Sequence, residues 1–508
     1  MAISLRRRPK ASQGRYTPNL WPVWIVAPLA LIAAGCLGYA IYHYAYDHFA
    51  QAAKDQTPTK PININDVLKA TVTALTLIGA VLAGLYAYRK QLLSEGDAHR
   101  ADASQLADRY TTAAEQLGHD QAAVRLAGVY ALTRLADDWE EQRQVCIDVL
   151  CAYLRMPYEP NPAAPGHKAG EREVRLTIIS VIRDHLQDPK AATAWCRYRL
   201  DFTGAIFDGG TFGGSNFGGP VSFAGAAFSA GRVSFVGAAF AGGRVSFDGA
   251  AFDGGRVSFA GAAFDGEVSF DGAAFDGGTV SFAGAAFDGG KVSFAGAEFS
   301  TGRVSFDSVA FAGGTVSFDN AAFAGGTVSF KGATFAGGTV LFKGAAFNAG
   351  RVSFDGASFD GDTVSFDNAA FAGGRVSFKG ATFDGGTVLF KGAAFSGSTL
   401  SFLDTTFDSG RVSFEDAKIS GGGRISFRRG TFSGGTVSFE DAKISDGTID
   451  CEDATITDGV VTFRRVRFDG GTINFEDATI SGGTVDFDNA TFSGTAFIWG
   501  SVQVPPGA

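Results

Sequence analysis

The sequence predicts a mainly β repeat protein, preceded by a small α-helical module and two transmembrane helices. Phenylalanine recurs at short, regular intervals from Phe202 to Phe492, which is typical of a repeat architecture. Two long apolar segments precede the repeat, and a segment with helical spacing of its apolar residues follows them. At 508 residues, the chain is longer than one globular core usually supports. Several structural units are therefore expected.

Composition narrows the possible functions. The chain has 69 Gly, 47 Phe and a formal net charge of −9. From Asp201 onward there are 20 basic and 33 acidic side chains, a formal charge of −13. Direct nucleic-acid binding through phosphate neutralisation is therefore not expected of the repeats. The cysteines show no metal-ligand spacing, and we expect them to be reduced core residues: Cys36, Cys146, Cys151, Cys196 and Cys451.

The two apolar segments have the length of membrane spans. Residues 20–42 carry no charge, and residues 67–88 carry only Lys69, while roughly 20 apolar residues suffice to cross a bilayer. A signal peptide is the alternative for the first segment, but its apolar stretch is longer than such peptides contain. Basic residues gather before the first segment and after the second, which predicts a multi-pass protein of the cell membrane with both termini cytoplasmic.

The predicted organisation follows from these segments. It comprises a basic N-terminus (1–19), a first transmembrane helix (20–46), an external loop (47–65), a second transmembrane helix (66–88), an α-helical module (89–200), a β-solenoid (201–499) and a C-terminal tail (500–508).

The module between the spans and the repeat is predicted to contain three packing helices. Apolar residues at helical spacing place them at about 124–135, 145–154 and 174–186. We expect its arginines to lie on an ordinary solvated face, with contact to anionic lipid headgroups as the alternative. Its cysteines and its turn histidine are expected to pack and not to catalyse. The arginines considered are Arg125, Arg134 and Arg143, and the other residues are Cys146, Cys151 and His119.

The repeat obeys a simple spacing rule. Phe202, Phe207, Phe212 and Phe217 are five residues apart. After them the spacing mostly alternates between five and seven residues, so the unit V-S-F-x-G-A-x-F-x-G-G-T is about 12 residues long. Each unit thus contains two pentapeptides, VSFxG and AxFxG, and two extra residues.

These pentapeptides resemble the pentapeptide-repeat family over about residues 201–499. The resemblance implies a right-handed quadrilateral β-helix, with the central Phe and the small or β-branched residue two positions before it pointing inward. The strings RLAGVYALTRLADD and VLCAYLRMPY of the module further resemble membrane-anchored members from high-GC Gram-positive bacteria. Representative core residues are then Phe202, Phe207, Phe235, Phe240, Phe330, Phe335, Phe378 and Phe383.

The two extra residues leave two closures of the coil open. A coil has either four faces in roughly 24 residues or two faces in roughly 12. The residues after the first Phe of each unit point outward, and the larger coil stacks them with alternating charge. This alternation and the space that two Phe rings need favour the larger coil. The candidate outer-face contacts are Lys331, Lys343, Asp355, Asp367, Lys379 and Lys391.

No catalytic, cofactor-binding or metal-binding residues are predicted. The repeat contains no His, and its D-G-G-T strings lack the nine-residue register of calcium-binding solenoids. We therefore expect no enzyme and no small-molecule substrate. The expected function is a cytoplasmic scaffold that is anchored in the lipid bilayer and binds an unidentified protein partner along the solenoid.

Two alternatives remain open at this point. Some family members imitate duplex DNA and protect the topoisomerase gyrase, and an acidic solenoid fits that description. Arg428, Arg429, Arg464, Arg465 and Arg467 count against it, because they make the distal surface mixed in charge. Outward Thr residues in T-V-S stretches also suggest an ice-binding or other surface-binding solenoid, although arginines interrupt the array.

The protein should stay with the membrane fraction during extraction with high salt or carbonate, because apolar spans and not charge hold it there. A cysteine introduced at Gln56 should react with an impermeant maleimide on intact cells, whereas one introduced at Ser501 should not. Release by salt alone would contradict the spans, and the reverse labelling would contradict the orientation.

Overall fold

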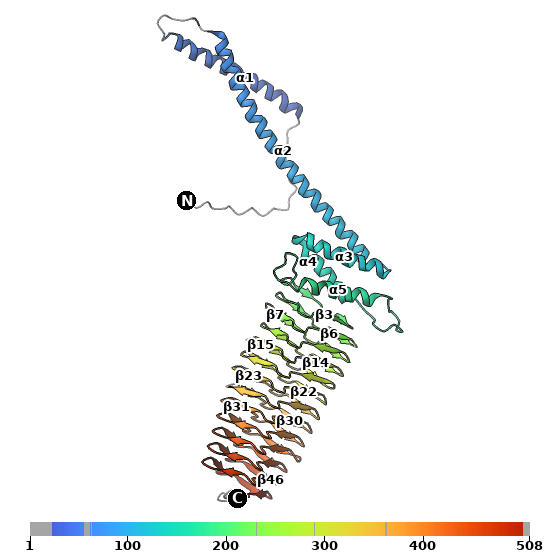
Figure 1. Cartoon of the computed structure of the whole chain (residues 1–508), viewed down its shortest axis with the longest axis vertical. Coiled ribbons are helices and arrows are strands. Elements are labelled where there is room, and N and C mark those ends of the chain that lie inside the picture. The colour runs from blue at the N-terminus through green and yellow to red at the C-terminus, as the bar shows by residue number, and fades with distance from the viewer. Residues whose placement is uncertain are drawn as a thin grey trace. The chain divides into compact units, whose positions relative to one another are not determined.

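The computed structural model describes residues 23–54, 61, 63–229, 231–288, 290–360 and 363–500. The chain divides into two compact units, Met1–Gln105 and Leu106–Ala508, both drawn in Figure 1.

The first unit contains two long helices. Helix α1 covers Val23–Lys54 and helix α2 covers Ile64–Leu117, so α2 continues into the second unit. Among the described residues, one segment is long and apolar enough to cross a membrane, namely Ile64–Tyr88, with a mean hydropathy of 1.8. It matches the second predicted span. The first predicted span begins outside the described residues. A signal sequence would satisfy the same criteria of length and composition as Ile64–Tyr88.

The second unit begins with a helical layer. It contains the end of α2, α3 (Ala122–Asp138), a short 3₁₀ turn (Glu140–Gln142), α4 (Arg143–Arg155) and α5 (Glu171–His185). Gly128 lets α3 approach α2 closely, because a Cβ at this position would lie 2.5 Å from the backbone nitrogen of Leu117. Helices α4 and α5 contact the first strands of the repeat. The layer therefore covers the open end of the first coil.

The repeat forms four parallel sheets, one for each face of the coil (Figure 1). We name the sheets A to D in the order in which the chain meets them. The four strands of one coil are β24 (Thr339–Leu341), β25 (Ala346–Asn348), β26 (Arg351–Ser353) and β27 (Ser358–Asp360). Sheet A runs from β1 (Leu200–Asp201) to β48 (Thr484–Asp486), sheet B from β2 (Ile206–Phe207) to β49 (Thr491–Ser493), sheet C from β3 (Gly210–Thr211) to β50 (Ala496–Ile498), and sheet D from β7 (Ala239–Phe240) to β47 (Thr479–Ile480).

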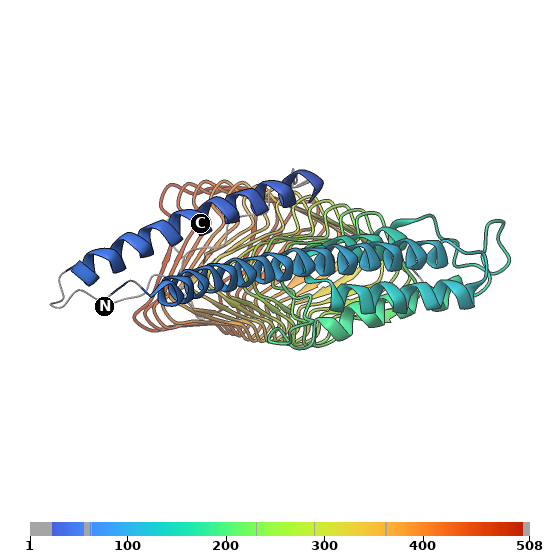
Figure 2. The ribbon, with the colours of Figure 1, turned by 90° about the horizontal axis from the view of Figure 1, so that it is seen from above.

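Strand register confirms the larger coil. Val316 pairs with Val340, and Val340 pairs with Val364, so partners on adjacent coils are two repeat units apart and the two-faced coil is excluded. Seen from above, successive coils follow one another with a similar outline (Figure 2). In the first coil Leu200 pairs with Val221, which is a shorter step. This coil is built from the uninterrupted pentapeptides, so the two-residue insertions lengthen the later coils.

Phenylalanine rings fill the interior of the solenoid. Phe330 is fully buried and stacks at 4.8 Å on both Phe306 and Phe354, one coil before and one coil after it. Its edge also meets Phe318 of sheet A at 5.7 Å and 89°. Edge-to-face pairs of this kind stabilise a core beyond the burial of area alone. The remaining predicted core residues are also buried: Phe202, Phe207, Phe235, Phe240, Phe335, Phe378 and Phe383.

Aromatic contacts also cover the last coil. The indole ring of Trp499 stacks on Phe475 at 5.8 Å and on Phe497 at 5.0 Å. It thereby lies over the end of the column of sheet C. From the sequence we expect Trp499 and Val502 to cover this open coil, because core Phe would otherwise be exposed to water, and the position of Trp499 agrees with that. Val502, which we expected to share this role, lies outside the described residues.

Replacing Phe330 by Ala should lower the free energy of unfolding by about 3–5 kcal/mol, because it empties one position of a packed column. Replacing its neighbour Lys331 by Ala should cost less than about 1 kcal/mol, since that side chain is exposed. Urea denaturation of the two variants provides the comparison. Equal losses would mean that the inward and outward positions are confused.

Candidate functional surfaces

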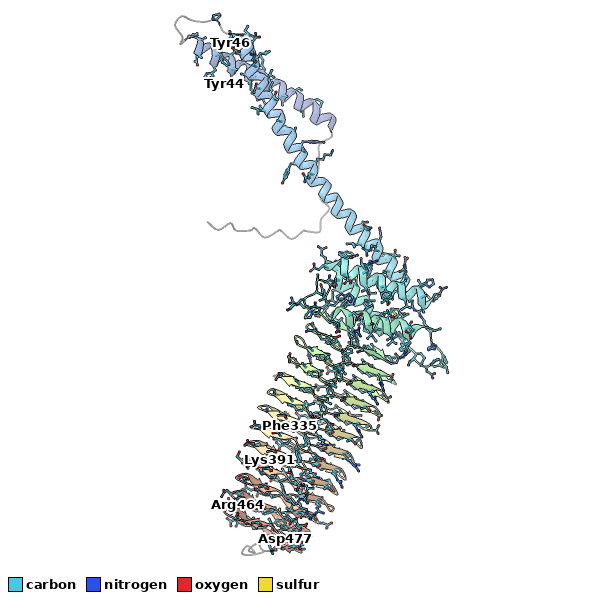
Figure 3. All side chains as sticks on the ribbon, viewed as in Figure 1. Tyr44, Tyr46, Phe335, Lys391, Arg464 and Asp477 are labelled. Atoms are coloured by element: carbon cyan, nitrogen blue, oxygen red, sulfur yellow. The ribbon has the colours of Figure 1, made fainter. Side chains whose placement is uncertain are left out.

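The predicted outer-face residues fall into two separate columns. Lys331, Asp355 and Lys379 follow the buried Phe residues of sheet C, whereas Lys343, Asp367 and Lys391 follow those of sheet A. Lys391 is labelled on the solenoid in Figure 3. Because sheet B lies between sheets A and C along the coil, the structure does not bring the six residues together as one site.

The aspartates of these columns tie adjacent coils together. Asp355 Oδ1 accepts a hydrogen bond of 3.2 Å from the backbone N–H of Lys379, one coil later. The hydroxyl of Ser377 also donates to the same oxygen. Asp367 accepts in the same way from the backbone N–H of Lys391, at 3.1 Å. The aspartates therefore bind the backbone of the next coil, and the alternation of charge along each column is a secondary feature.

A column of arginines runs along the outer edge of sheet C. Each arginine is the first residue of a strand of sheet C, and each side chain is exposed. Adjacent strands lie about 4.8 Å apart. Successive arginines are one or two coils apart, because some of the strands between them begin with Thr. With the exception of Arg424, none forms an ion pair with a carboxylate in the part of the chain that the structure describes. This arginine column consists of Arg232, Arg256, Arg303, Arg351, Arg375 and Arg424.

The distal coils differ, because their arginines are paired. Arg429 contacts Asp404 at 2.6 Å, and Arg465 contacts Asp441 at 2.8 Å, in each case across adjacent coils. Arg464, labelled in Figure 3, lies 3.8 Å from Asp486. The distal surface is thus mixed in charge, as the sequence indicates.

One distal aspartate is buried. Asp450 takes a position where sheet C usually has Ser and is 1% exposed. Arg424 of the preceding coil donates to Oδ2, and Asn474 of the following coil donates to Oδ1 at 3.2 Å. One carboxylate therefore joins three consecutive coils.

The helical layer contains a buried ionic cluster that sequence reasoning missed. Glu171, at the start of α5, lies 3.2 Å from Arg125 of α3 and 3.9 Å from Arg175 of α5. The hydroxyl of Tyr153 donates to Glu171 at 2.9 Å, and Tyr158 lies on the guanidinium of Arg175 at 4.5 Å. Burial lowers the pKa of Arg175, and the charge of Glu171 opposes that shift.

The prediction that the three arginines of the module lie on a solvated face is therefore wrong for Arg125 and Arg143. Arg125 is 3% exposed and Arg143 is 5% exposed, whereas Arg134 is exposed. Arg143 donates to the backbone carbonyls of Ala136 and Ala192 at 2.7 and 2.9 Å. No local signal separates these positions, because their partners lie on other helices and loops.

A partly open cavity of about 140 Å³ lies beside the ionic cluster. Its lining includes Gly118 and His119 after α2, Arg125 of α3, Tyr153 of α4 and Lys168 before α5. The cavity thus collects residues from every helix of the layer.

The described residues offer no metal site, since no group of three or more His, Cys, Asp or Glu among them could hold an ion. Their buried thiols are poor nucleophiles, because burial raises the pKa of Cys146 to about 11 and that of Cys151 to about 12.

Replacing Glu171 by Gln should lower the free energy of unfolding of the helical layer by about 3–5 kcal/mol, because two buried guanidiniums lose their shared countercharge. As a control, Asp138→Asn breaks the exposed pair with Arg109, whose side chains are 39% and 49% accessible, and should cost about 0–1 kcal/mol. Thermal unfolding followed by circular dichroism measures both. A loss no larger than that of the control would contradict the importance of the buried cluster.

Comparison with known proteins agrees with the architecture. Residues 202–251 match the family model for pentapeptide repeats in nine copies, and no curated protein matches the chain. The matched segment contains the first coils, and the same pentapeptide units continue through the stacked strands to Ile498. Residues 202–251 of the β-solenoid thus show the pentapeptide repeats of that family.

Proposed function

We propose that the chain is a membrane-anchored scaffold whose solenoid binds an acidic protein partner along the arginine column of sheet C. The observation that carries the proposal is this column of exposed, mostly unpaired guanidiniums on an otherwise acidic solenoid. Family membership favours a repeat protein without catalytic activity.

The packed interior supports binding on the outside. Rings of neighbouring coils lie 4.7–4.9 Å apart along most of the columns, as in Phe318 over Phe342 at 4.8 Å. A ligand would have to displace these rings to enter, whereas the outer faces offer a long, regular surface.

The arginine column favours a protein over other partners. Arginine binds carboxylates through two parallel hydrogen bonds, and the column repeats this donor at intervals of about 4.8 or 9.6 Å. The repeat has 33 acidic and 20 basic side chains. This negative charge opposes the binding of polyanions such as nucleic acids, which carry negative charge along their whole length. An acidic patch on a folded protein contacts the column alone.

Membrane anchoring rests on the span Ile64–Tyr88. Arg89 and Lys90 follow directly after it, which favours a cytoplasmic location for everything that follows. In this arrangement the solenoid would hold its partner on the cytoplasmic side of the membrane.

Protection of gyrase by imitating duplex DNA is the second candidate function, and the net negative charge of the repeat supports it. The arginine column and the distal ion pairs oppose it, because a DNA mimic needs a uniformly negative face.

The proposal is tested by chemical crosslinking and affinity purification from native membranes. The double variant Arg351→Glu/Arg375→Glu should lose most of the crosslinked partner, because it reverses the charge of two adjacent coils. Arg411→Glu is the matched control, since Arg411 is an exposed arginine at the same strand position of sheet A, and it should retain the partner.

Equal recovery with both variants would contradict binding at sheet C. Recovery of gyrase, together with inhibition of supercoiling by the purified protein, would favour the DNA-mimic function instead.

A further inference from the structure

The cavity of the helical layer borders a guanidinium whose hydrogen bonds are incomplete. Nη1 of Arg125 donates to the backbone carbonyls of His119 and Asp120, at 3.0 and 2.6 Å. Among the described residues, its buried Nε and Nη2 form no hydrogen bond, although Nη2 lies 3.2 Å from a carboxylate oxygen of Glu171. A guanidinium carries five N–H donors, so three of them form no hydrogen bond here. Buried donors without an acceptor are rare and costly.

The nearby carboxylates do not satisfy these donors. Glu171 lies 3.2 Å from Nη2 of Arg125 but also neutralises Arg175 and accepts from Tyr153. Glu159 also lines the cavity, and its Oε1 accepts from the backbone N–H of Asn161 at 2.9 Å. One shared carboxylate therefore faces two buried guanidiniums.

Lys168 adds a second cation to a lining that also contains Glu159 and Glu171. Lys168 lines the cavity and is exposed to solvent, so its ammonium group can reach a ligand that enters. With Arg125 it forms a pair of cationic donors on one cavity. Such a pair is the arrangement by which proteins hold carboxylate and phosphate groups.

We propose that this cavity binds a small oxyanion, such as phosphate or a short carboxylate, through the ammonium group of Lys168 and the guanidinium of Arg125. The volume of about 140 Å³ exceeds that of several water molecules at about 30 Å³ each, so a ligand of a few non-hydrogen atoms fits. The oxyanion supplies the acceptors that Arg125 lacks and a second countercharge for the cluster.

The position of the cavity gives the bound anion a structural consequence. Its lining joins the residues that end α2 to α3, to the segment after α4 and to the start of α5. Binding would therefore hold these four helices together and stabilise the layer that covers the first coil. The C-terminal end of α2 lines the cavity and would therefore respond to the anion. The same helix begins with the candidate membrane span.

Isothermal titration of the full-length protein in neutral-lipid nanodiscs with inorganic phosphate tests the proposal, with sodium chloride at equal ionic strength as the reference. Phosphate should bind with measurable heat and raise the melting temperature of the helical layer, whereas chloride should not. Lys168→Gln should weaken phosphate binding about tenfold, the effect of losing one charge-assisted hydrogen bond.

Lys190→Gln is the matched control, because Lys190 is an exposed lysine of the same layer that does not line the cavity. It should bind phosphate like the unmodified protein. Arg125→Lys, which keeps the charge but not the planar donors, should also weaken binding. Because Lys168 is exposed, its variant decides the outcome even if the Arg125 variant does not fold.

Acetate and anionic-lipid nanodiscs distinguish the sources of the oxyanion. Binding of free phosphate or acetate supports a soluble ligand, and stabilisation only in nanodiscs with phosphatidylglycerol, lost in Lys168→Gln, supports a lipid headgroup at the same donors. No effect of any of these anions beyond that of chloride, or equal binding by Lys168→Gln and Lys190→Gln, would overturn the proposal.

Discussion

The stacking of phenylalanine rings at the spacing of hydrogen-bonded strands is the constraint on which the solenoid depends. Rings such as Phe306, Phe330 and Phe354 lie 4.8 Å apart, which is the distance that parallel strands require. Backbone pairing and side-chain packing therefore demand the same repeat along the axis. Because the rings occupy the interior, the charged groups of the repeat are left to its outer surface, including the arginine column.

Much of this fold is predictable from the sequence, because one spacing rule repeats for about 290 residues and fixes which side chains point inward. The coil length was also predictable, since only one closure stacks opposite charges. The buried cluster of the module was not. Arg125 and Glu171 are far apart in the sequence, and a polar residue on a helix does not reveal from its neighbours that another helix will cover it. The first predicted span stays a prediction, because it begins outside the described residues.

Both open ends of the stack are covered, by different means. At the first coil, Arg155 of α4 contacts Asp201 at 2.6 Å, and Tyr158 donates to Asp208 at 2.7 Å. At the last coil, Trp499 packs on Phe475 and Phe497. Uncovered strand edges would invite pairing with other chains. The polar cover at one end ties the module to the repeat, whereas the aromatic cover at the other end simply terminates it.

The closure of each coil after two repeat units has a genetic consequence. Residues 318–365 closely resemble residues 366–413, and each block contains two whole coils. A gene that gains or loses such a block, for example by slippage between similar DNA segments, changes the length of the solenoid and keeps every strand in register. Changes by other numbers of codons must be absorbed between strands, as in the shorter step from Val245 to Val268, where the core residues stay buried. Selection can therefore adjust the reach of this surface in whole coils, without redesigning its core.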